Sequence, residues 1–98
     1  MPVFLSNARK QELCRIMSSN LSTIRAKADM TQDELSERLG FARQTISAIE
    51  NSRRDMQWST FTAIDLFFSR DNELSRLMSA MGLLDEDVKK ILNIAQEG

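Results

Sequence analysis

Polar side chains at helical spacing mark one short segment near the middle of the chain. Residues 43–50 read Arg-Gln-Thr-Ile-Ser-Ala-Ile-Glu, and isoleucines stand at its fourth and seventh positions. In a helix both isoleucines point inward and the other side chains point outward. Arginine can bond guanine O6 and N7, glutamine can bond adenine N6 and N7, and threonine or alanine methyls can contact the thymine methyl. The candidate base-contacting residues are therefore Arg43, Gln44, Thr45, Ser47 and Ala48.

Four further residues on either side of this segment are suited to binding phosphate. Gln32 is expected at the start of a preceding helix, where its amide would act together with free backbone N–H groups. Asn51, Arg53 and Arg54 follow the segment in a polar loop, where they are placed for phosphates beside a groove.

The elements that must position these residues span 31–51. Thr31 is the clearest helix N-cap in the chain, because Glu34 stands three residues later and completes a capping box. Gly40 ends this first helix, since glycine adopts a left-handed conformation without steric cost. A second helix is expected from Arg43 to about Asn51. Two short helices joined at a glycine form the pattern of a helix-turn-helix.

Several residues together carry a resemblance to a known family. They are Thr31, Gln32, Leu35, Gly40, Ile46, Ile49, Glu50, Asn51, Trp58, Phe61, Ile64 and Phe68. With these positions, the segment from about Leu21 to Phe68 resembles the Cro/C1-type, or Xre-like, helix-turn-helix family of phage repressors and bacterial regulators. The resemblance implies a bundle of about five helices that binds operator DNA as a dimer. It implies Gln32 on phosphate, Arg43, Gln44 and Ala48 at base edges, and Asn51 with Arg53 on the backbone.

Three residues depart from that family pattern. Ala42 stands where the family usually has a serine or threonine cap, whose loss costs about 1 kcal/mol. Ser52 replaces the usual glycine of the following loop, and Met56 replaces the usual proline. These departures bear on the geometry of the loop and hence on its phosphate contacts.

Helices are also expected outside the matching segment. Ser6 or Asn7 caps a helix that reaches Ala28, either continuous or broken at 18–20 by poor helix formers. The inner face of a fourth helix is expected to contain Trp58, Phe61, Ile64, Leu66, Phe67 and Phe68. A fifth helix carries Leu74, Leu77, Met78 and Met81 and stops at Gly82, and Asp85 caps a last helix over 86–96.

Composition excludes several classes of site. Among 98 residues there is no histidine and a single cysteine, Cys14, so an intramolecular disulfide, a thiolate zinc cluster and histidine-based catalysis are excluded. Cys14 is interpreted as a packing residue, and Asp85, Glu86 and Asp87 as a helix N-terminus rather than a metal site. We expect no enzymatic activity, no cofactor and no metal. No apolar run reaches membrane-spanning length, so a cytoplasmic protein is expected.

Charge is distributed unevenly along the chain. Residues 1–54 hold nine basic and six acidic side chains, hence +3, whereas residues 55–98 hold four basic and eight acidic ones, hence −4. A basic front half suits a protein that presents one face to phosphates. Because the back half is acidic, binding to another protein stays open as an alternative to binding DNA.

The resulting expectation is an all-α, lambda-repressor-like single domain over 1–98. It comprises a helical extension (1–20), a core (21–68) and C-terminal helices (69–98). The expected function is sequence-specific DNA binding by a dimeric transcriptional regulator, a repressor, on a near-palindromic operator. The alternative is a protein-interaction module on the same scaffold, an antitoxin or adaptor. For the apolar stripe of the last helix, with Leu83 and Leu84, two roles stay open: dimerisation or closure of the monomer's own core.

Overall fold

The computed structural model describes residues 4–93, and this part of the chain contains helices and no β-strand. The all-α fold class is confirmed. Six helices follow one another: α1 (Asn7–Lys27), α2 (Gln32–Leu39), α3 (Arg43–Glu50), α4 (Trp58–Ser69), α5 (Asn72–Ala80) and α6 (Glu86–Ile91).

Side-chain caps set the beginnings of four helices. Ser6 accepts a hydrogen bond from the N–H of Arg9 at the start of α1, and Thr31 caps α2 in the expected capping box. Asp71 and Asp85 cap α5 and α6 in the same way. Each cap satisfies an amide that would otherwise lack a partner, so these short sequences determine where the helices begin.

Helix α1 is continuous through residues 18–20, and it therefore joins the expected N-terminal extension to the core as one element. Met17 and Leu21 are fully buried on either side of this stretch. The side-chain amide of Asn20 donates to the carbonyl of Ile16 at 2.8 Å, within the helix itself. Burial of one apolar face outweighs the poor helix propensity of the serines and asparagine.

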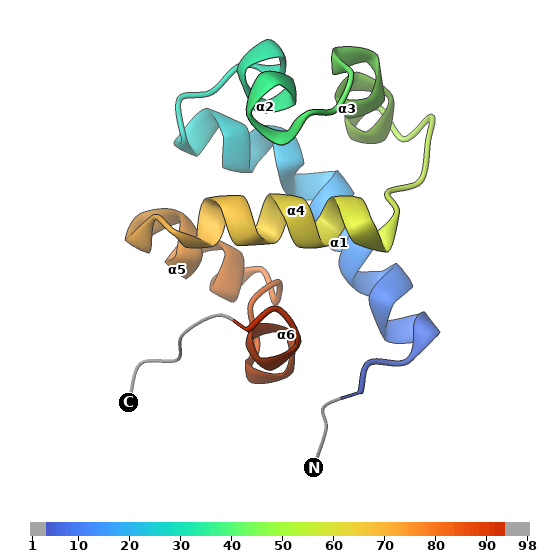
Figure 1. Cartoon of the computed structure of the whole chain (residues 1–98), viewed down its shortest axis with the longest axis vertical. Coiled ribbons are helices and arrows are strands. Elements are labelled where there is room, and N and C mark those ends of the chain that lie inside the picture. Colours follow the sequence, from blue (N-terminus) through green and yellow to red (C-terminus); the bar gives the residue numbers. More distant parts are fainter. Residues whose placement is uncertain (1–3, 94–98) are drawn as a thin grey trace.

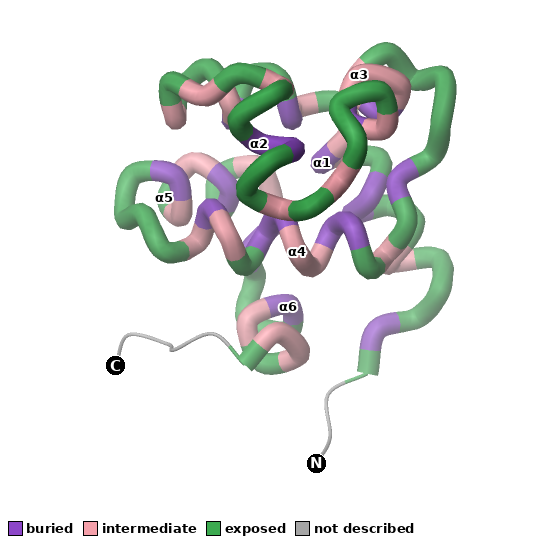
Figure 2. Tube along the Cα trace, turned by 45° about the horizontal axis from the view of Figure 1, so that its top comes forward, coloured by how far each residue is buried: buried purple, intermediate pink, exposed green. Residues whose placement is uncertain are grey.

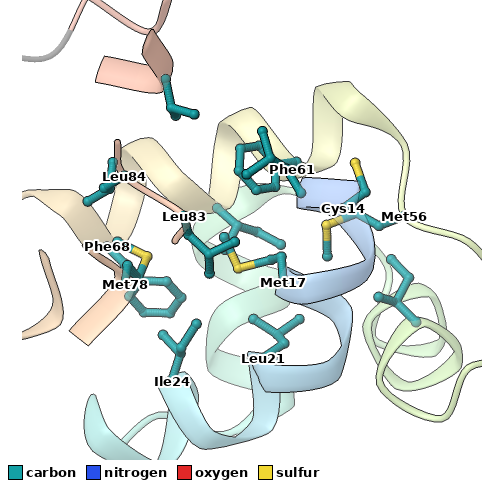
Figure 3. Close-up of a cluster of buried hydrophobic side chains, with 14 of the residues drawn as sticks. Cys14, Met17, Leu21, Ile24, Met56, Phe61, Phe68, Met78, Leu83 and Leu84 are labelled. Atoms are coloured by element: carbon teal, nitrogen blue, oxygen red, sulfur yellow. The ribbon is translucent and has the colours of Figure 1, made fainter. Parts of the chain in front are cut away.

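Helix α4 crosses the molecule in front of α1, with α2 and α3 above it and α6 below it (Figure 1). The core lies between α1, α4 and α5, and Figure 3 shows Met17, Phe61, Phe68 and Met78 converging there. Cys14 belongs to this cluster, as expected for a packing residue, and burial raises the pKa of its thiol.

Of the six residues expected on the inner face of α4, Leu66 was placed wrongly, whereas Trp58 and Phe67 are partly buried and pack against the core. Leu66 does not belong to the inner face, because 42% of the residue is exposed. Trp58 is half-buried rather than a core residue: its ring stacks on Phe61 at 4.8 Å, and the ammonium of Lys10 lies 5.5 Å from its centre. Apolar residues surround nearly the whole helix, so their spacing does not identify one buried face.

The C-terminal helix is shorter than expected. It ends at Ile91 and not at Gln96, and residues 94–98, which include the expected stripe residue Ala95, lie outside the described part of the chain. Leu83, Leu84 and Val88 are all buried within this one chain. Figure 2 accordingly shows part of α6 in the colour of buried residues. For these three residues, closure of the monomer's core is the role that the structure supports.

Asp65 is the one charged residue among residues 4–93 whose side chain is completely buried. It faces inward from α4 with 0% exposure, and neither carboxylate oxygen has a hydrogen-bond partner within the described residues. Burial, and secondarily the negative charge of Asp85, raises the pKa of Asp65 to about 8. At neutral pH the carboxyl group is therefore mainly protonated, because an unpaired charge in the core is strongly unfavourable.

Candidate nucleic-acid interface

Helices α2 and α3 pack against each other around a turn at residues 40–42. Gly40 has a φ of 76°, the left-handed conformation expected at this position, and its N–H donates to the carbonyl of Ser36 at 2.8 Å. Ser36, Ile46 and Ile49 are buried, while the Ser36 hydroxyl donates to the carbonyl of Asp33. Because Ser36 is small, α3 can approach α2 closely, and Ile46 and Ile49 supply the buried apolar side of α3.

The outward side of α3 carries the expected base-contacting residues. Arg43 and Gln44 are exposed, and Thr45, Ser47 and Ala48 are half-buried. A surface hollow of about 490 Å³ is lined by Arg43, Gln44, Ser47, Ala48 and Arg53. The structure thus brings four of the five candidate base readers together with one candidate phosphate ligand.

Comparison with known protein families supports this geometry. Residues 21–55 match the family model described as helix-turn-helix, which includes α2, the turn and α3. These residues are a helix-turn-helix domain of the Cro/C1 type. It is a DNA-binding fold found in transcriptional regulators. No curated protein and no solved structure matches the chain.

Gln32, at the first position of α2 in the helix-turn-helix domain, is held by α3. Its side-chain amide donates to the Glu50 carboxylate at 3.0 Å, and the residue is half-buried. A second amide hydrogen and the amide oxygen have no partner within residues 4–93. The Gln32 side chain therefore lies at the start of α2 with one amide hydrogen bonded to Glu50 and the other available to a ligand.

Arg25 of α1 completes this arrangement, and the sequence interpretation missed it. Its Nε donates to Glu50 at 2.6 Å, an Nη donates to the other carboxylate oxygen at 2.8 Å, and the other Nη donates to the carbonyl of Met30 at 3.0 Å. The two side chains are only 15% and 7% exposed. Neighbouring residues of a helix point in different directions, so the buried Ile49 did not by itself indicate that Glu50 would be buried and would need a partner.

The electrostatics of Glu50 follow from these contacts. Burial alone raises the pKa of this carboxyl, but the hydrogen bonds from Arg25 and Gln32 outweigh it and hold the pKa below its usual value. Glu50 is therefore ionised at neutral pH, and it ties α1, α2 and α3 together. This fixed arrangement positions the helix-turn-helix domain without occupying its outward face.

Arg43 makes one contact that the sequence did not predict. Its Nε lies 3.3 Å from the carboxylate of Asp33 on α2, and both side chains are mostly exposed, at 63% and 71%. An exposed pair of this kind contributes less than about 1 kcal/mol. The pair is therefore weak enough for a nucleic acid to displace or share it.

The loop after α3 places the remaining candidate phosphate ligands. Asn51, Arg53 and Arg54 are all exposed, and neither arginine forms an ion pair within residues 4–93. The N–H of Ser52 donates to the carbonyl of Ile49, and the N–H of Arg53 donates to the carbonyl of Ala48. These two hydrogen bonds form a Schellman motif at the end of α3. Ser52 occupies the left-handed position with a φ of 60°, where glycine is favoured.

Helix α3 begins without a side-chain cap, as the sequence predicted. Ala42 has the extended conformation of an N-cap residue but forms no cap hydrogen bond. The first N–H groups of α3 therefore depend on solvent or on a bound group for a partner. This is the end of the helix that carries Arg43 and Gln44.

The part of the chain that the structure describes lacks two other features. None of its helices has the length and apolar character needed to cross a membrane. No three histidine, cysteine, aspartate or glutamate side chains come together there in a way that would hold a metal ion.

Proposed function

We propose that this protein binds double-stranded DNA sequence-specifically as a dimer and acts as a transcriptional repressor, with α3 in the major groove. The observation that carries the proposal is the hollow that groups Arg43, Gln44, Ser47 and Ala48 with Arg53 on a helix-turn-helix domain. Side chains that can bond base edges thus lie beside one that can bond phosphate, as groove recognition requires.

The proposed roles divide between two sets of residues. Arg43, Gln44, Thr45, Ser47 and Ala48 contact base edges. Gln32 contacts a phosphate together with the free N–H groups at the start of α2, and Asn51, Arg53 and Arg54 contact phosphates from the following loop. Glu50 and Arg25 act as positioning residues, because they hold α3 and Gln32 in place from behind.

The test is selection of bound duplexes from a random pool, followed by affinity measurements at several salt concentrations. We expect one near-palindromic sequence to be enriched. Arg43→Ala and Gln44→Ala should each weaken binding to that sequence by roughly 5- to 150-fold, the cost of about 1–3 kcal/mol for one base contact, while binding to random DNA changes little. Arg53→Ala should weaken binding to all sequences and reduce the salt slope by about one.

Arg76→Ala is the matched control, since Arg76 is an exposed arginine on α5. It should leave both affinity and selectivity unchanged. If no sequence is enriched at any salt concentration, the DNA-binding proposal fails. A protein-interaction module on the same scaffold would then be the better description.

A further inference from the structure

A groove separates the first half of α1 from the loop that follows α3, and we call it the α1–loop groove. One wall is a single face of α1, whose residues recur at helical spacing: Gln11, Cys14, Arg15, Ser18 and Ser19. The loop forms the other wall, and the groove encloses about 590 Å³ between Ile49, Ser52, Arg54, Asp55 and Met56 and the helix. Figure 1 shows this loop on the same side of the molecule as the first half of α1.

The wall formed by α1 lies outside the helix-turn-helix match, which begins at residue 21. We propose that the α1–loop groove binds the sugar–phosphate backbone of double-stranded DNA, so that Arg15, Ser18 and Ser19 extend the DNA interface onto α1. This extension rests on the proposed function, because a duplex must already lie against α3.

The polar side chains of the α1–loop groove suit a phosphodiester. Arg15 on the helix wall and Arg54 on the loop wall are exposed, and neither forms an ion pair within residues 4–93. Guanidinium groups bind phosphate oxygens through their charge and through paired N–H donors. Ser18 and Ser19 add hydroxyl donors beside Arg15, and serine hydroxyls commonly donate to DNA phosphates.

One acidic side chain also lines the groove. Asp55 is exposed and likewise forms no ion pair in the described part of the chain, so the lining carries two positive charges and one negative charge. A phosphate therefore meets a net attraction, which Asp55 reduces. Removing this carboxylate and removing the Arg15 guanidinium are thus expected to change the affinity for DNA in opposite directions.

The floor of the groove holds its two walls in fixed positions. Cys14, Ile49 and Met56 are only 7%, 1% and 6% exposed, and Cys14 lies next to Met56 in Figure 3. Because these side chains are packed in the core, α1 and the loop present their polar groups at a set separation. A ligand therefore lies across the polar rims and does not enter the core.

The loop also joins the α1–loop groove to the hollow over α3. Arg53 lines that hollow, whereas its neighbours Ser52 and Arg54 line the α1–loop groove. The major groove of B-DNA is about 12 Å wide and is bounded by a phosphate backbone on each side. A duplex that holds α3 in its major groove therefore brings a backbone to the loop, and the wall of α1 lies directly across from that loop.

The experiment measures binding of the full chain to a random-sequence duplex of about 20 base pairs, between about 0.1 M and 1 M salt. Arg15→Gln removes one phosphate contact, so the slope of log affinity against log salt should fall by about 0.9. This change amounts to a loss of roughly eightfold at 0.1 M relative to 1 M salt. Arg76→Gln removes an equal charge from an exposed position of α5 outside the groove, and it should leave slope and affinity unchanged.

Two further changes test the hydroxyls and the acid. Replacing both Ser18 and Ser19 by alanine should weaken binding about two- to tenfold at an unchanged salt slope, because only neutral hydrogen bonds are lost and alanine favours the helix. Asp55→Asn should tighten binding about two- to fivefold, whereas Asp87→Asn, on an exposed position of α6, should not.

Substitution in the DNA tests the contact itself. The phosphates flanking the sequence that the protein selects are replaced one at a time by neutral methylphosphonates. At one position the replacement should weaken binding of the wild type but not of Arg15→Gln, because the variant has already lost that contact. The inference is overturned if Arg15→Gln and Arg76→Gln have equal salt slopes, or if every methylphosphonate weakens wild type and Arg15→Gln equally.

The outcomes also separate this extension from the proposed function. A salt slope that depends on Arg15, with no sequence enriched from a random pool, keeps the extension and removes sequence-specific regulation. An enriched sequence that wild type and Arg15→Gln bind equally keeps the proposed function and removes the extension.

Discussion

Asp65 provides the sharpest test of the energetics of this fold. We expect Asp65→Asn to abolish most of the fall in stability that the wild-type protein shows between pH 5 and pH 8. The pKa of Asp65 is raised from 3.8 in the unfolded chain to about 8 in the folded protein. In this range the folded state retains a proton that the unfolded state has lost, so the free energy of unfolding decreases as pH rises and levels off above pH 8.

The magnitude follows from the size of that shift. Each pH unit between the two pKa values costs about 1.36 kcal/mol, so the interval from pH 5 to pH 8 costs at most about 4 kcal/mol. Asparagine carries no titratable proton, and its buried amide costs a pH-independent 1–3 kcal/mol or so if it stays unpartnered. The free energy of unfolding of Asp65→Asn relative to that of wild type should therefore rise by about 3–4 kcal/mol from pH 5 to pH 8.

Urea unfolding followed by circular dichroism at each pH measures this difference directly. Asp87→Asn, which alters an exposed aspartate of α6, is the control and should leave the slope of the wild type in place. If the stabilities of wild type and Asp65→Asn run parallel from pH 5 to pH 8, Asp65 is not a buried carboxyl group without a partner in the folded protein.

Three further substitutions test other contacts. Ser52→Gly should raise the free energy of unfolding by about 0.5–1 kcal/mol, because glycine removes the left-handed strain but also loosens the unfolded chain; thermal unfolding that shows a loss would contradict this. Arg25→Ala leaves the Glu50 carboxylate buried with a single donor and should cost about 3 kcal/mol in urea unfolding, whereas a cost below about 1 kcal/mol would show that the pair is not buried. Asp33→Asn frees Arg43 and should tighten DNA binding about three- to tenfold in titrations. Glu37→Gln removes an equal charge from an unpaired position of α2 and should have a smaller effect. Equal effects of the two variants would show that the pairing of Arg43 with Asp33 is irrelevant to DNA binding.

The bounds of α2 and the start of α3 were predictable because their determinants are local. The capping box of Thr31, the left-handed Gly40 and the missing cap at Ala42 all depend on residues within four positions of one another. The outward and inward sides of α3 were likewise predictable, because Ile46 and Ile49 give the helix a single apolar stripe.

The features that were missed depend on distant parts of the chain. The Arg25–Glu50 pair joins residues 25 positions apart, and no local pattern links them. The orientation of α4 depends on which of its many apolar residues meet α1 and α5, so Leu66 and Asp65 were placed incorrectly or not noticed. In an evenly apolar helix, packing against neighbours decides which residues are buried, and spacing alone does not.

The contacts that Glu50 makes with three helices have a consequence for how the sequence of such a protein can evolve. The rear of α3 is anchored by Ile46, Ile49 and Glu50, whereas Arg43 and Gln44 at its front contribute nothing to the core. Under the proposed function, replacing the front residues therefore alters which DNA is recognised at almost no cost in folding. The side chains that carry the proposed recognition are thus separate from those that carry stability in this helix, so single substitutions that the scaffold tolerates can change the proposed specificity.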